Sequence, residues 1–254
     1  METRCRYSDT VTPRKQHTLA LLIRAILNMI RRRRTAGAGL VVRDMAGGEG
    51  RYPRLQPADR RYPLSYSGRW ILASPPVLLR ALAEVGVAAK LEVYENDPRA
   101  YNALRTYMLT QRRQAVGVPV ALYCGDSQIV APASGRSINY CDMSGPMYPF
   151  AALLRLLNGR KRTDGIMFFN AGGHKRQVGA GRGMPLTQFF KQLKKRHVYV
   201  QLTTARYGRQ LVFVYATDQQ VPSALTSLDF RNVKTAVGRR LLYTITHNKV
   251  GDKL

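Results

Sequence analysis

The sequence is short of long apolar runs, of cysteine and of acidic residues. No stretch of about 18 or more uncharged apolar residues occurs in the 254-residue chain, which predicts no membrane-spanning helix. The first residues, METRCRYSDTVTPRKQ, contain no apolar segment of the kind that a signal peptide has. With 45% hydrophobic residues and no low-complexity tract, the chain is expected to be globular and to have no membrane partner.

Cysteine is scarce. Cys5, Cys124 and Cys141 have no metal-ligand spacing and are too few for a disulfide framework. We therefore expect no metal site and a reducing, intracellular location, in the cytoplasm, at the nucleoid or in a virion. Cys124 and Cys141 each end an apolar run, where a buried and inert thiol is usual.

Acidic residues are also few, with 15 Asp and Glu against 41 Lys and Arg, for a net charge of +26. Residues 151–254 carry 19 basic and 4 acidic side chains, whereas residues 37–150 carry 13 and 9. Self-repulsion on this scale opposes compaction unless a polyanion neutralises it. Nucleic acid is the expected partner, because phosphate neutralisation by Lys and Arg releases counterions. The alternative is a generally basic, solvated surface.

What is present begins with an amphipathic segment, residues 17–30, whose apolar residues recur at helical spacing. Four basic residues follow it: Arg31, Arg32, Arg33 and Arg34. Basic residues in the last turn of a helix interact favourably with the helix dipole, but four in a row are more than this interaction requires. These arginines are either a phosphate-binding arm or the solvated end of a docked helix. Residues 1–36 are thus predicted to form a basic helical extension.

From Gly39 onward, short apolar runs alternate with amphipathic stretches, a pattern that predicts a parallel sheet with helices on both faces. The expected strands are 40–43, 91–94, 118–123, 137–141 and 165–169, and the expected helices are 75–85, 98–112, 148–157 and 184–196. Two more strands, 197–203 and 210–217, are joined by a short turn that permits only antiparallel pairing.

This pattern predicts one α/β domain over residues 37–217, followed by a basic tail at 218–254. Residues 51–73, rich in Pro, Arg and Tyr, are expected to be an insertion after the first strand. Its aromatic side chains either stack on unpaired bases or anchor the insertion to the core: Tyr62, Tyr66 and Trp70.

Acidic residues gather where the expected strands end, the edge at which open α/β sheets bind ligands. Asp44 closes the first strand, and small residues follow it at every second position, which lets a backbone pass close beneath a ligand. Glu95 ends the second strand, where a carboxylate can accept both hydroxyls of a ribose. The remaining members of this set are Ala46, Gly48, Gly50 and, after the third strand, Asp126.

In these motifs and in the order of its elements, the sequence resembles class I S-adenosylmethionine (SAM)-dependent methyltransferases across residues 37–217. The resemblance implies a Rossmann-like α/β fold with a mostly parallel seven-stranded sheet that ends in an antiparallel hairpin. It also implies SAM as cofactor, with Asp44, Ala46, Gly48 and Gly50 at its methionine part, Glu95 at the ribose and Asp126 at the adenine. The insertion and Ala73-Ser74-Pro75 are loosely similar to the three-Cys-motif partner and phage-type methyltransferases.

The catalytic half of the family pattern is incomplete. Asp142-Met143-Ser144-Gly145 stands at the catalytic motif but lacks the prolines and aromatic residue of amino-group DNA methyltransferases. Cys141 lies inside the strand rather than beside a proline, as cytosine-C5 transfer requires. Asp142 is expected to orient the acceptor, and His174 to act as a general base, with Lys175 and Arg176 on phosphate. The alternative for residues 174–176 is a basic loop without a catalytic histidine.

The function that the sequence predicts is SAM-dependent methyl transfer to DNA or RNA. A second hypothesis is a methyltransferase-like domain that no longer catalyses and serves as a nucleic-acid-binding or structural part of a larger nucleoprotein assembly. A third is an enzyme that consumes SAM without methylating a polymer.

Overall fold

The computed structural model describes residues 11–33, 39–112, 115, 117–142, 150–158, 163–170, 186–196, 198–206, 209–217, 232–237 and 240–245. The chain divides into two compact units, Met1–Ser127 and Gln128–Leu254. Of the helices in these described ranges, none combines the length and the apolar character that crossing a membrane requires.

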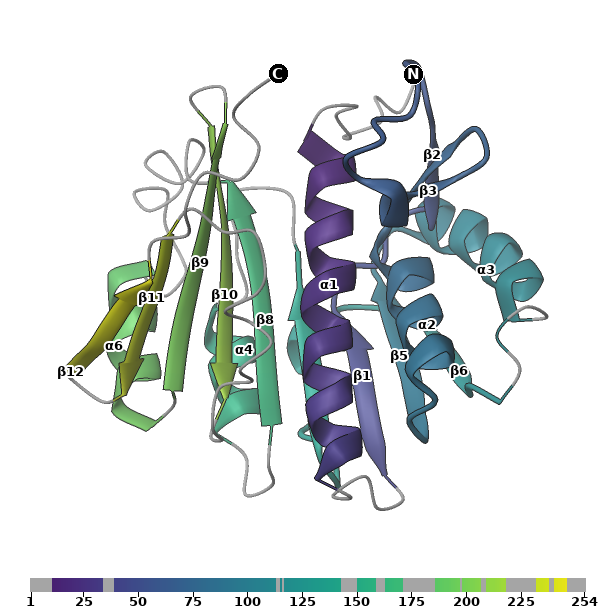
Figure 1. Ribbon diagram of the computed structural model, residues 1–254. Helices are drawn as coiled ribbons and strands as arrows, with labels where there is room; N and C mark the ends of the chain where they lie inside the picture. The colour runs from purple at the N-terminus through teal and green to yellow at the C-terminus, as the bar shows by residue number, and fades with distance from the viewer. Residues whose placement is uncertain are drawn as a thin grey trace. The chain divides into compact units, whose positions relative to one another are not determined.

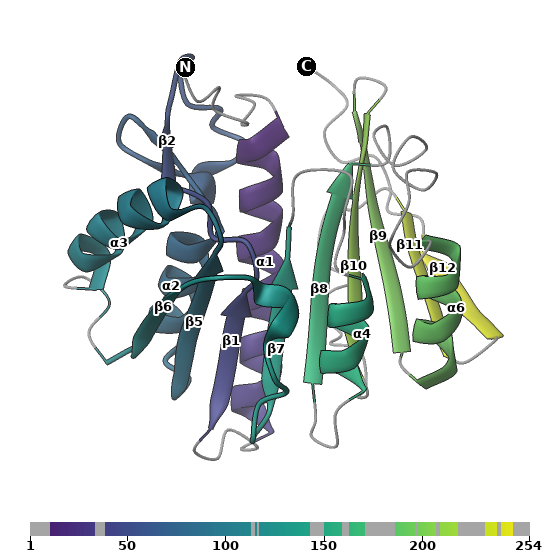
Figure 2. The same cartoon turned by 180° about the vertical axis from the view of Figure 1, so that it is seen from behind.

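The first unit is built on three parallel strands in the order β1-β5-β6, with bounds Leu40–Asp44, Ala89–Glu95 and Val120–Cys124. Helix α2 (Ser74–Val85) precedes β5, and helix α3 (Pro98–Arg112) connects β5 to β6. Such crossovers are what parallel pairing requires. Val42, Leu91 and Val93 are fully buried on this sheet, and α2 lies over it in Figure 1 and behind it in Figure 2.

Local sequence signals account for the ends of these helices. Pro75 and Pro76 lie in the first turn of α2, where a missing N–H costs nothing. Gly86 ends α2 in the left-handed conformation, with φ 67°. The carboxylate of Asp97 accepts the N–H of Arg99 at 2.8 Å and so caps the first turn of α3.

Helix α1 (Val11–Arg32) packs against α2 through one continuous apolar face (Figure 1). This confirms the helix expected at residues 17–30 and extends it in both directions. Arg24 forms an ion pair with Glu84 of α2, and Arg31 Nη1 donates to the carbonyl of Val85 at 3.1 Å. The apolar face consists of Leu19, Leu22, Ile23, Ile26, Leu27 and Ile30, all fully buried.

The insertion expected at 51–73 is a small three-stranded antiparallel sheet in the order β2-β4-β3. Its strands are β2 (Arg51–Pro53), β3 (Tyr66–Ser67) and β4 (Trp70–Leu72), with the short helix η1 (Pro63–Ser65) before β3. Ala73 N donates to the carbonyl of Gly50 at 2.9 Å, so the insertion leaves and rejoins the fold at the same point.

The second unit holds a sheet in the order β12-β11-β9-β10-β8-β7. Strands β7 (Ser137–Cys141) and β8 (Thr163–Asn170) are parallel, whereas β10 (Arg209–Thr217) is antiparallel to both β8 and β9 (Val198–Arg206). The antiparallel pairing of β10 with β9 confirms the hairpin that the sequence predicts, and β10 lies between β8 and β9. Helices α4 (Phe150–Leu157) and α6 (Leu186–Arg196) pack together, with the rings of Phe150 and Phe189 stacked at 4.8 Å.

Two strands lie where the sequence indicates only a basic tail. Strand β11 (Asn232–Val237) pairs antiparallel with β9, and β12 (Arg240–Ile245) pairs with β11. These strands extend the sheet of the second unit beyond its hairpin. The crossover-linked parallel strands and the antiparallel closing strands confirm the Rossmann-like α/β expectation.

Candidate functional site

The three strand ends of the first unit carry the expected cofactor residues to one edge. Strands β1, β5 and β6 are parallel neighbours, so their carboxyl ends lie at the same edge of the sheet. Asp44, Glu95 and the Gly125-Asp126 turn are therefore all at that edge. Backbone hydrogen bonds connect the loops after these strands. Gly47 N donates to the carbonyl of Tyr94, and Gly125 N to that of Glu95, both at 2.9 Å.

Glu95 connects the glycine loop to the start of α3. Its Oε2 accepts the N–H of Gly48 at 2.7 Å, and its Oε1 accepts the N–H of Asp97 at 2.9 Å. An ionised carboxylate offers about four acceptor positions. Two positions therefore remain for further donors, the number that the two hydroxyls of a ribose would use.

The glycine loop has a backbone conformation that favours glycine, and aromatic side chains of the protein pack closely against it. Gly48 and Gly50 have φ values of 60° and 82°, which residues with a side chain rarely adopt. A Cβ on Gly48 would lie 2.6 Å from the hydroxyl oxygen of Tyr52, and one on Gly50 would lie 2.9 Å from the ring of Tyr107. The loop therefore requires glycine at both positions that the sequence singled out.

Asp44 stabilises the backbone of this loop through a hydrogen bond. It is fully buried, and its Oδ1 accepts the N–H of Ala46 at 3.1 Å. Asp126, by contrast, is exposed at the end of its turn. The two acids thus differ in what they can do, because a buried carboxylate fixes the backbone whereas an exposed one can meet a ligand directly.

Two residues of the loop region were missed by the sequence analysis. A Cβ on Gly47 would lie 2.5 Å from Val93 Cγ1, so this glycine lets the loop pass over β5. The close approach of the Tyr52 hydroxyl to Gly48 places this side chain over the glycine loop. Gly47 stands directly before Gly48, but neither its contact with Val93 nor the position of Tyr52 is marked in the sequence.

Tyr62 and Trp70 connect the insertion to the core, which is one of the two roles expected for its aromatic residues, whereas the hydroxyl of Tyr66 bonds within the insertion. The guanidinium of Arg51 lies 4.0 Å from the ring centroid of Trp70 and 4.6 Å from that of Tyr107 on α3. Tyr62 contacts His17 of α1, with 5.9 Å between ring centroids. The hydroxyl of Tyr66 accepts the N–H of Asp59 at 3.2 Å.

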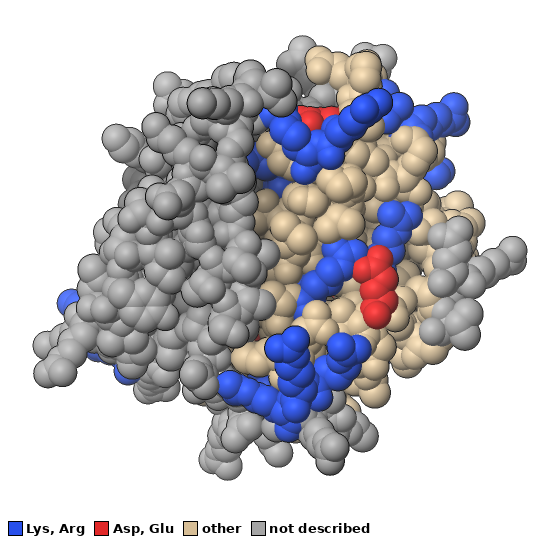
Figure 3. Space-filling model, viewed as in Figure 1, with Lys and Arg blue, Asp and Glu red and all other residues tan. Residues whose placement is uncertain are grey.

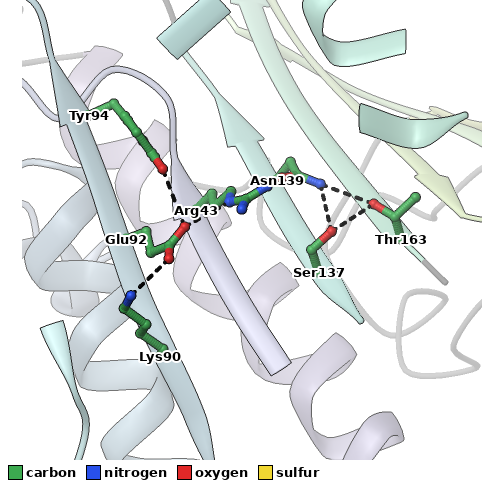
Figure 4. Close-up of polar contacts among 7 residues, drawn as sticks. All are labelled: Arg43, Lys90, Glu92, Tyr94, Ser137, Asn139 and Thr163. Atoms are coloured by element: carbon green, nitrogen blue, oxygen red, sulfur yellow. Dashed lines mark hydrogen bonds and ion pairs between the residues drawn. The ribbon is translucent and has the colours of Figure 1, made fainter. Parts of the chain in front are cut away.

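A buried ion pair joins β1 to β5 in the sheet below this edge (Figure 4). Arg43 Nε donates to Glu92 Oε2 at 2.9 Å, and Lys90 Nζ lies 3.0 Å from Glu92 Oε1. Burial alone would raise the pKa of Glu92, but the hydrogen bonds from Arg43 and Lys90 outweigh it and lower this pKa. Burial and the nearby charge of Glu92 raise the pKa of Tyr94 to about 12. Near neutral pH, Glu92 therefore stays ionised and Tyr94 stays neutral. Their role is to stabilise the pairing of β1 with β5 rather than to transfer protons.

Asp142 belongs to the second unit, where it follows the last residue of β7. It is half-buried, and the hydroxyl of Tyr140 donates to its Oδ2 at 3.2 Å. Behind it in the same unit, Asn139 Nδ2 donates to the hydroxyls of Ser137 and Thr163 (Figure 4). The other expected catalytic and phosphate-binding residues lie outside the described residues: Arg34, His174, Lys175 and Arg176.

The basic end of α1 lies at the other edge of the first-unit sheet. Arg31, Arg32 and Arg33 are exposed, and the bond from Arg31 to Val85 places them beside the turn that leads into β5. The carboxyl end of β5, at Glu95, lies seven residues along the strand, or about 20 Å. The expected phosphate-binding arm and the expected cofactor residues are therefore at opposite edges.

The cysteines differ from each other. Cys141 is fully buried, as expected, but the expectation of a buried thiol is wrong for Cys124, which is exposed. The reason is its place, since it is the last residue of β6, the outer strand of the first-unit sheet. Within the described ranges, no cluster of His, Cys, Asp or Glu has the arrangement that a metal ion needs.

Comparisons with known proteins bear on the fold. No protein-family model matches the sequence, and a search of the curated proteins found no match. Among solved structures, the chain is similar to protein LPL1258 from Legionella pneumophila str. Philadelphia 1, with a TM-score of 0.54 and 12% identity over 80% of this chain and 86% of that one.

The chain is also similar to magnesium protoporphyrin IX methyltransferase (ChlM) from Synechocystis PCC 6803. The structure with bound SAM gives a TM-score of 0.49 and 12% identity, covering 86% of this chain and 87% of that one. The structure with bound SAH gives 0.48 and 12%, covering 82% and 86%. The strand orders of the two units show a Rossmann-like α/β fold, and the similarity to LPL1258 is a similarity of fold.

Proposed function

We propose that this chain is a SAM-dependent methyltransferase and that its substrate is DNA or RNA. The observation that carries the cofactor assignment is the position of Glu95. Its carboxylate holds the glycine loop through Gly48 and the start of α3 through Asp97, and it keeps two acceptor positions for a ribose.

The residues of this edge fit the parts of SAM in turn. Gly48 and Gly50 would let the backbone of the loop pass beneath its methionine portion, because both have a positive φ that residues with a side chain rarely adopt. Glu95 would accept the ribose hydroxyls, and the exposed Asp126 would accept from the adenine amino group. Asp44 and Ala46 would contribute by fixing the backbone of the loop.

SAM, when bound, supplies a methyl group on a positively charged sulfur. The protein's own contribution is then to hold an acceptor atom in line with that methyl, and positioning of this kind supplies about 7–11 kcal/mol of a reaction barrier. We assign the orientation of the acceptor to Asp142 and the removal of its proton to His174. The excess of 41 basic over 15 acidic residues supports a polyanionic substrate.

Calorimetric titration with SAM and with its demethylated product tests the cofactor assignment. We expect both to bind the wild-type chain, and we expect Asp126→Ala to weaken binding because the adenine amino group loses its acceptor. Absence of binding to the wild-type chain, or an Asp126→Ala variant with unchanged affinity, would contradict the assignment.

Transfer of a tritiated methyl group to DNA, RNA and protein, offered separately, tests the substrate. We expect label in DNA or RNA. If SAM binds but no polymer is labelled, the chain is better described as a methyltransferase-like domain with a binding or structural role. That alternative is favoured by Asp142-Met143-Ser144-Gly145, which lacks the residues of the amino-group motif.

A further inference from the structure

The insertion presents a basic surface in addition to its anchored side. Residues 51–73 contain five arginines and a single acid, Asp59. Arg61 binds that acid through two nitrogens, with an ion-pair distance of 2.6 Å. Arg60 and Arg69 are exposed, and the part of the chain that the structure describes gives neither an ion-pair partner. No carboxylate in that part of the chain neutralises these two charges, although the guanidinium of Arg69 lies 5.2 Å from the ring centroid of Trp70.

This surface is fixed beside the cofactor edge. The insertion begins directly after Gly50 and returns to it through the hydrogen bond from Ala73 N. Arg54 N donates to the carbonyl of Arg69 at 2.9 Å, which holds the two ends of the basic segment together. Since Arg51 is held between the rings of Trp70 and Tyr107, the small sheet is also tied to α3. The arginines consequently have a defined position next to the glycine loop.

Figure 3 shows basic side chains on this face in a group at the top, in a group at the bottom and in a smaller group between them, beside acidic side chains. The lower group contains Arg31, Arg32 and Arg33, at the amino edge of the sheet. A polymer held only there would be about one strand length, roughly 20 Å, from the edge where a methyl group would be transferred. The insertion, in contrast, begins and ends at Gly50 of the glycine loop.

The acids of the cofactor edge add a second argument. Glu95, Asp97 and Asp126 lie at or just beyond the strand ends, where they would repel phosphate groups. A polyanion that places a base near this edge therefore needs cations directly beside the acids. The insertion, which begins directly after Gly50 of the glycine loop, carries such cations.

We propose that Arg54, Arg60 and Arg69 form the surface that binds the phosphate backbone of the substrate nucleic acid, and that the insertion thereby directs a base to the cofactor edge. This inference rests on the proposed function, because it names the substrate surface of the same site. The arginine cluster of α1 is not that surface.

Two variants with the same change in net charge test the proposal. Arg60→Gln/Arg69→Gln removes two charges from the insertion, and Arg32→Gln/Arg33→Gln removes two from the end of α1. Binding of fluorescently labelled single-stranded RNA and of duplex DNA is measured by anisotropy from about 50 to 200 mM salt, a range over which phosphate contacts change affinity strongly. Thermal unfolding and SAM titration on each variant establish that fold and cofactor edge are intact.

We expect the insertion variant to lose about tenfold or more in affinity at 100 mM salt, and its plot of log affinity against log salt to be shallower by about 1.4–1.8, the slope of two phosphate contacts. The α1 variant should stay within about threefold of wild type, with its slope nearly unchanged. Equal losses in the two variants, or the larger loss in the α1 variant, would overturn the inference.

The outcomes separate this inference from the proposed function. If the wild-type chain binds nucleic acid and SAM but the insertion variant is unaffected, only the inference fails. If the wild-type chain binds SAM but neither nucleic acid, the inference and the polymer substrate fail together while the cofactor site stands. If it binds nucleic acid through the insertion but not SAM, the surface is correct and the methyltransferase assignment is wrong.

Discussion

Glu95 shows how a single residue can organise a binding edge. Its two oxygens accept N–H groups from the loop after β1 and from the start of α3, so one side chain sets the distance between two loops. A ligand that also donates to this carboxylate enters a site whose geometry is already fixed. Under the proposed function, the same acid would have both a structural and a ligand-binding role.

Replacing Glu95 by Gln tests this double role. The amide keeps one acceptor oxygen but points two donors at a site where Gly48 and Asp97 already donate. Because a hydrogen bond to a charged group contributes about 1.5–3 kcal/mol, SAM affinity should fall by about tenfold to a hundredfold. Calorimetry measures the affinity.

Asp97→Asn is the matched control for that measurement. Asparagine caps a helix as well as aspartate does, so the bond to Arg99 N can persist and SAM affinity should change little. Equal losses in the Asp97→Asn and Glu95→Gln variants would show that the carboxylate of Glu95 has no particular role.

Whether the role of a residue could be predicted depends on whether it is constrained by its neighbours in the sequence or by a contact formed on folding. Asp44, Gly48, Gly50 and Glu95 were predictable because local chain order, a strand followed by a turn, sets their task. Gly47 was not, because its constraint is the side chain of Val93 on another strand, which only the folded chain brings to 2.5 Å. Contacts of this kind have no signature in the local sequence.

At the scale of single elements, α1 is held to the insertion by a histidine that folding keeps neutral. Burial, and then the charge of Arg24, lower the pKa of His17 below its usual 6.5. A base with a lowered pKa contributes stability above its unfolded pKa and loses it as the pH falls below that value. The free energy of unfolding should therefore decrease below about pH 6.5.

His17→Phe keeps a ring against Tyr62 and removes the titrating group. Chemical denaturation at about pH 7.5 and 5.5, above and below the usual pKa, should show a smaller difference for this variant than for wild type. An equal difference in the two proteins would assign the acid sensitivity to other groups.

The ion pair between β1 and β5 gives a second prediction for elements. Glu92→Leu leaves the guanidinium of Arg43, 8% exposed, without its buried carboxylate, which should cost about 3–5 kcal/mol of unfolding free energy. Arg43→Met/Glu92→Leu removes both charges and should recover most of that loss. Denaturant unfolding measures both, and a double variant no more stable than the single one would contradict the assignment.

Element length explains which parts of the fold the sequence predicts. The long helices and the buried strands carry enough periodic residues to be recognised, and their expected ranges agree with the structure to within a few residues. The strands of the insertion span two or three residues, one of them ending at Pro53, and are too short for a pattern. Strands β11 and β12 were missed because basic residues at 231, 234, 239 and 240 obscure their alternation.

At the scale of the whole molecule, the net charge of +26 opposes folding through self-repulsion. Raising salt from about 50 to 300 mM shortens the Debye length from about 14 to 6 Å and should raise the melting temperature. A bound polyanion should raise it further at low salt, because a ligand of the folded state stabilises that state. Differential scanning fluorimetry with and without RNA tests this, and a melting temperature independent of both would contradict it.

The hydrogen bond between Ala73 and Gly50 has a consequence for how such a protein diverges. Since the insertion departs and returns at one point, its length can change at small entropic cost, each doubling of a loop costing only about 0.6 kcal/mol. If the proposed function and the proposed role of the insertion hold, new polymer preferences can arise through substitutions and length changes between residues 54 and 69, while the loop that follows Asp44 keeps its shape. Selection on the substrate and selection on the cofactor would then act on separate segments of the same chain.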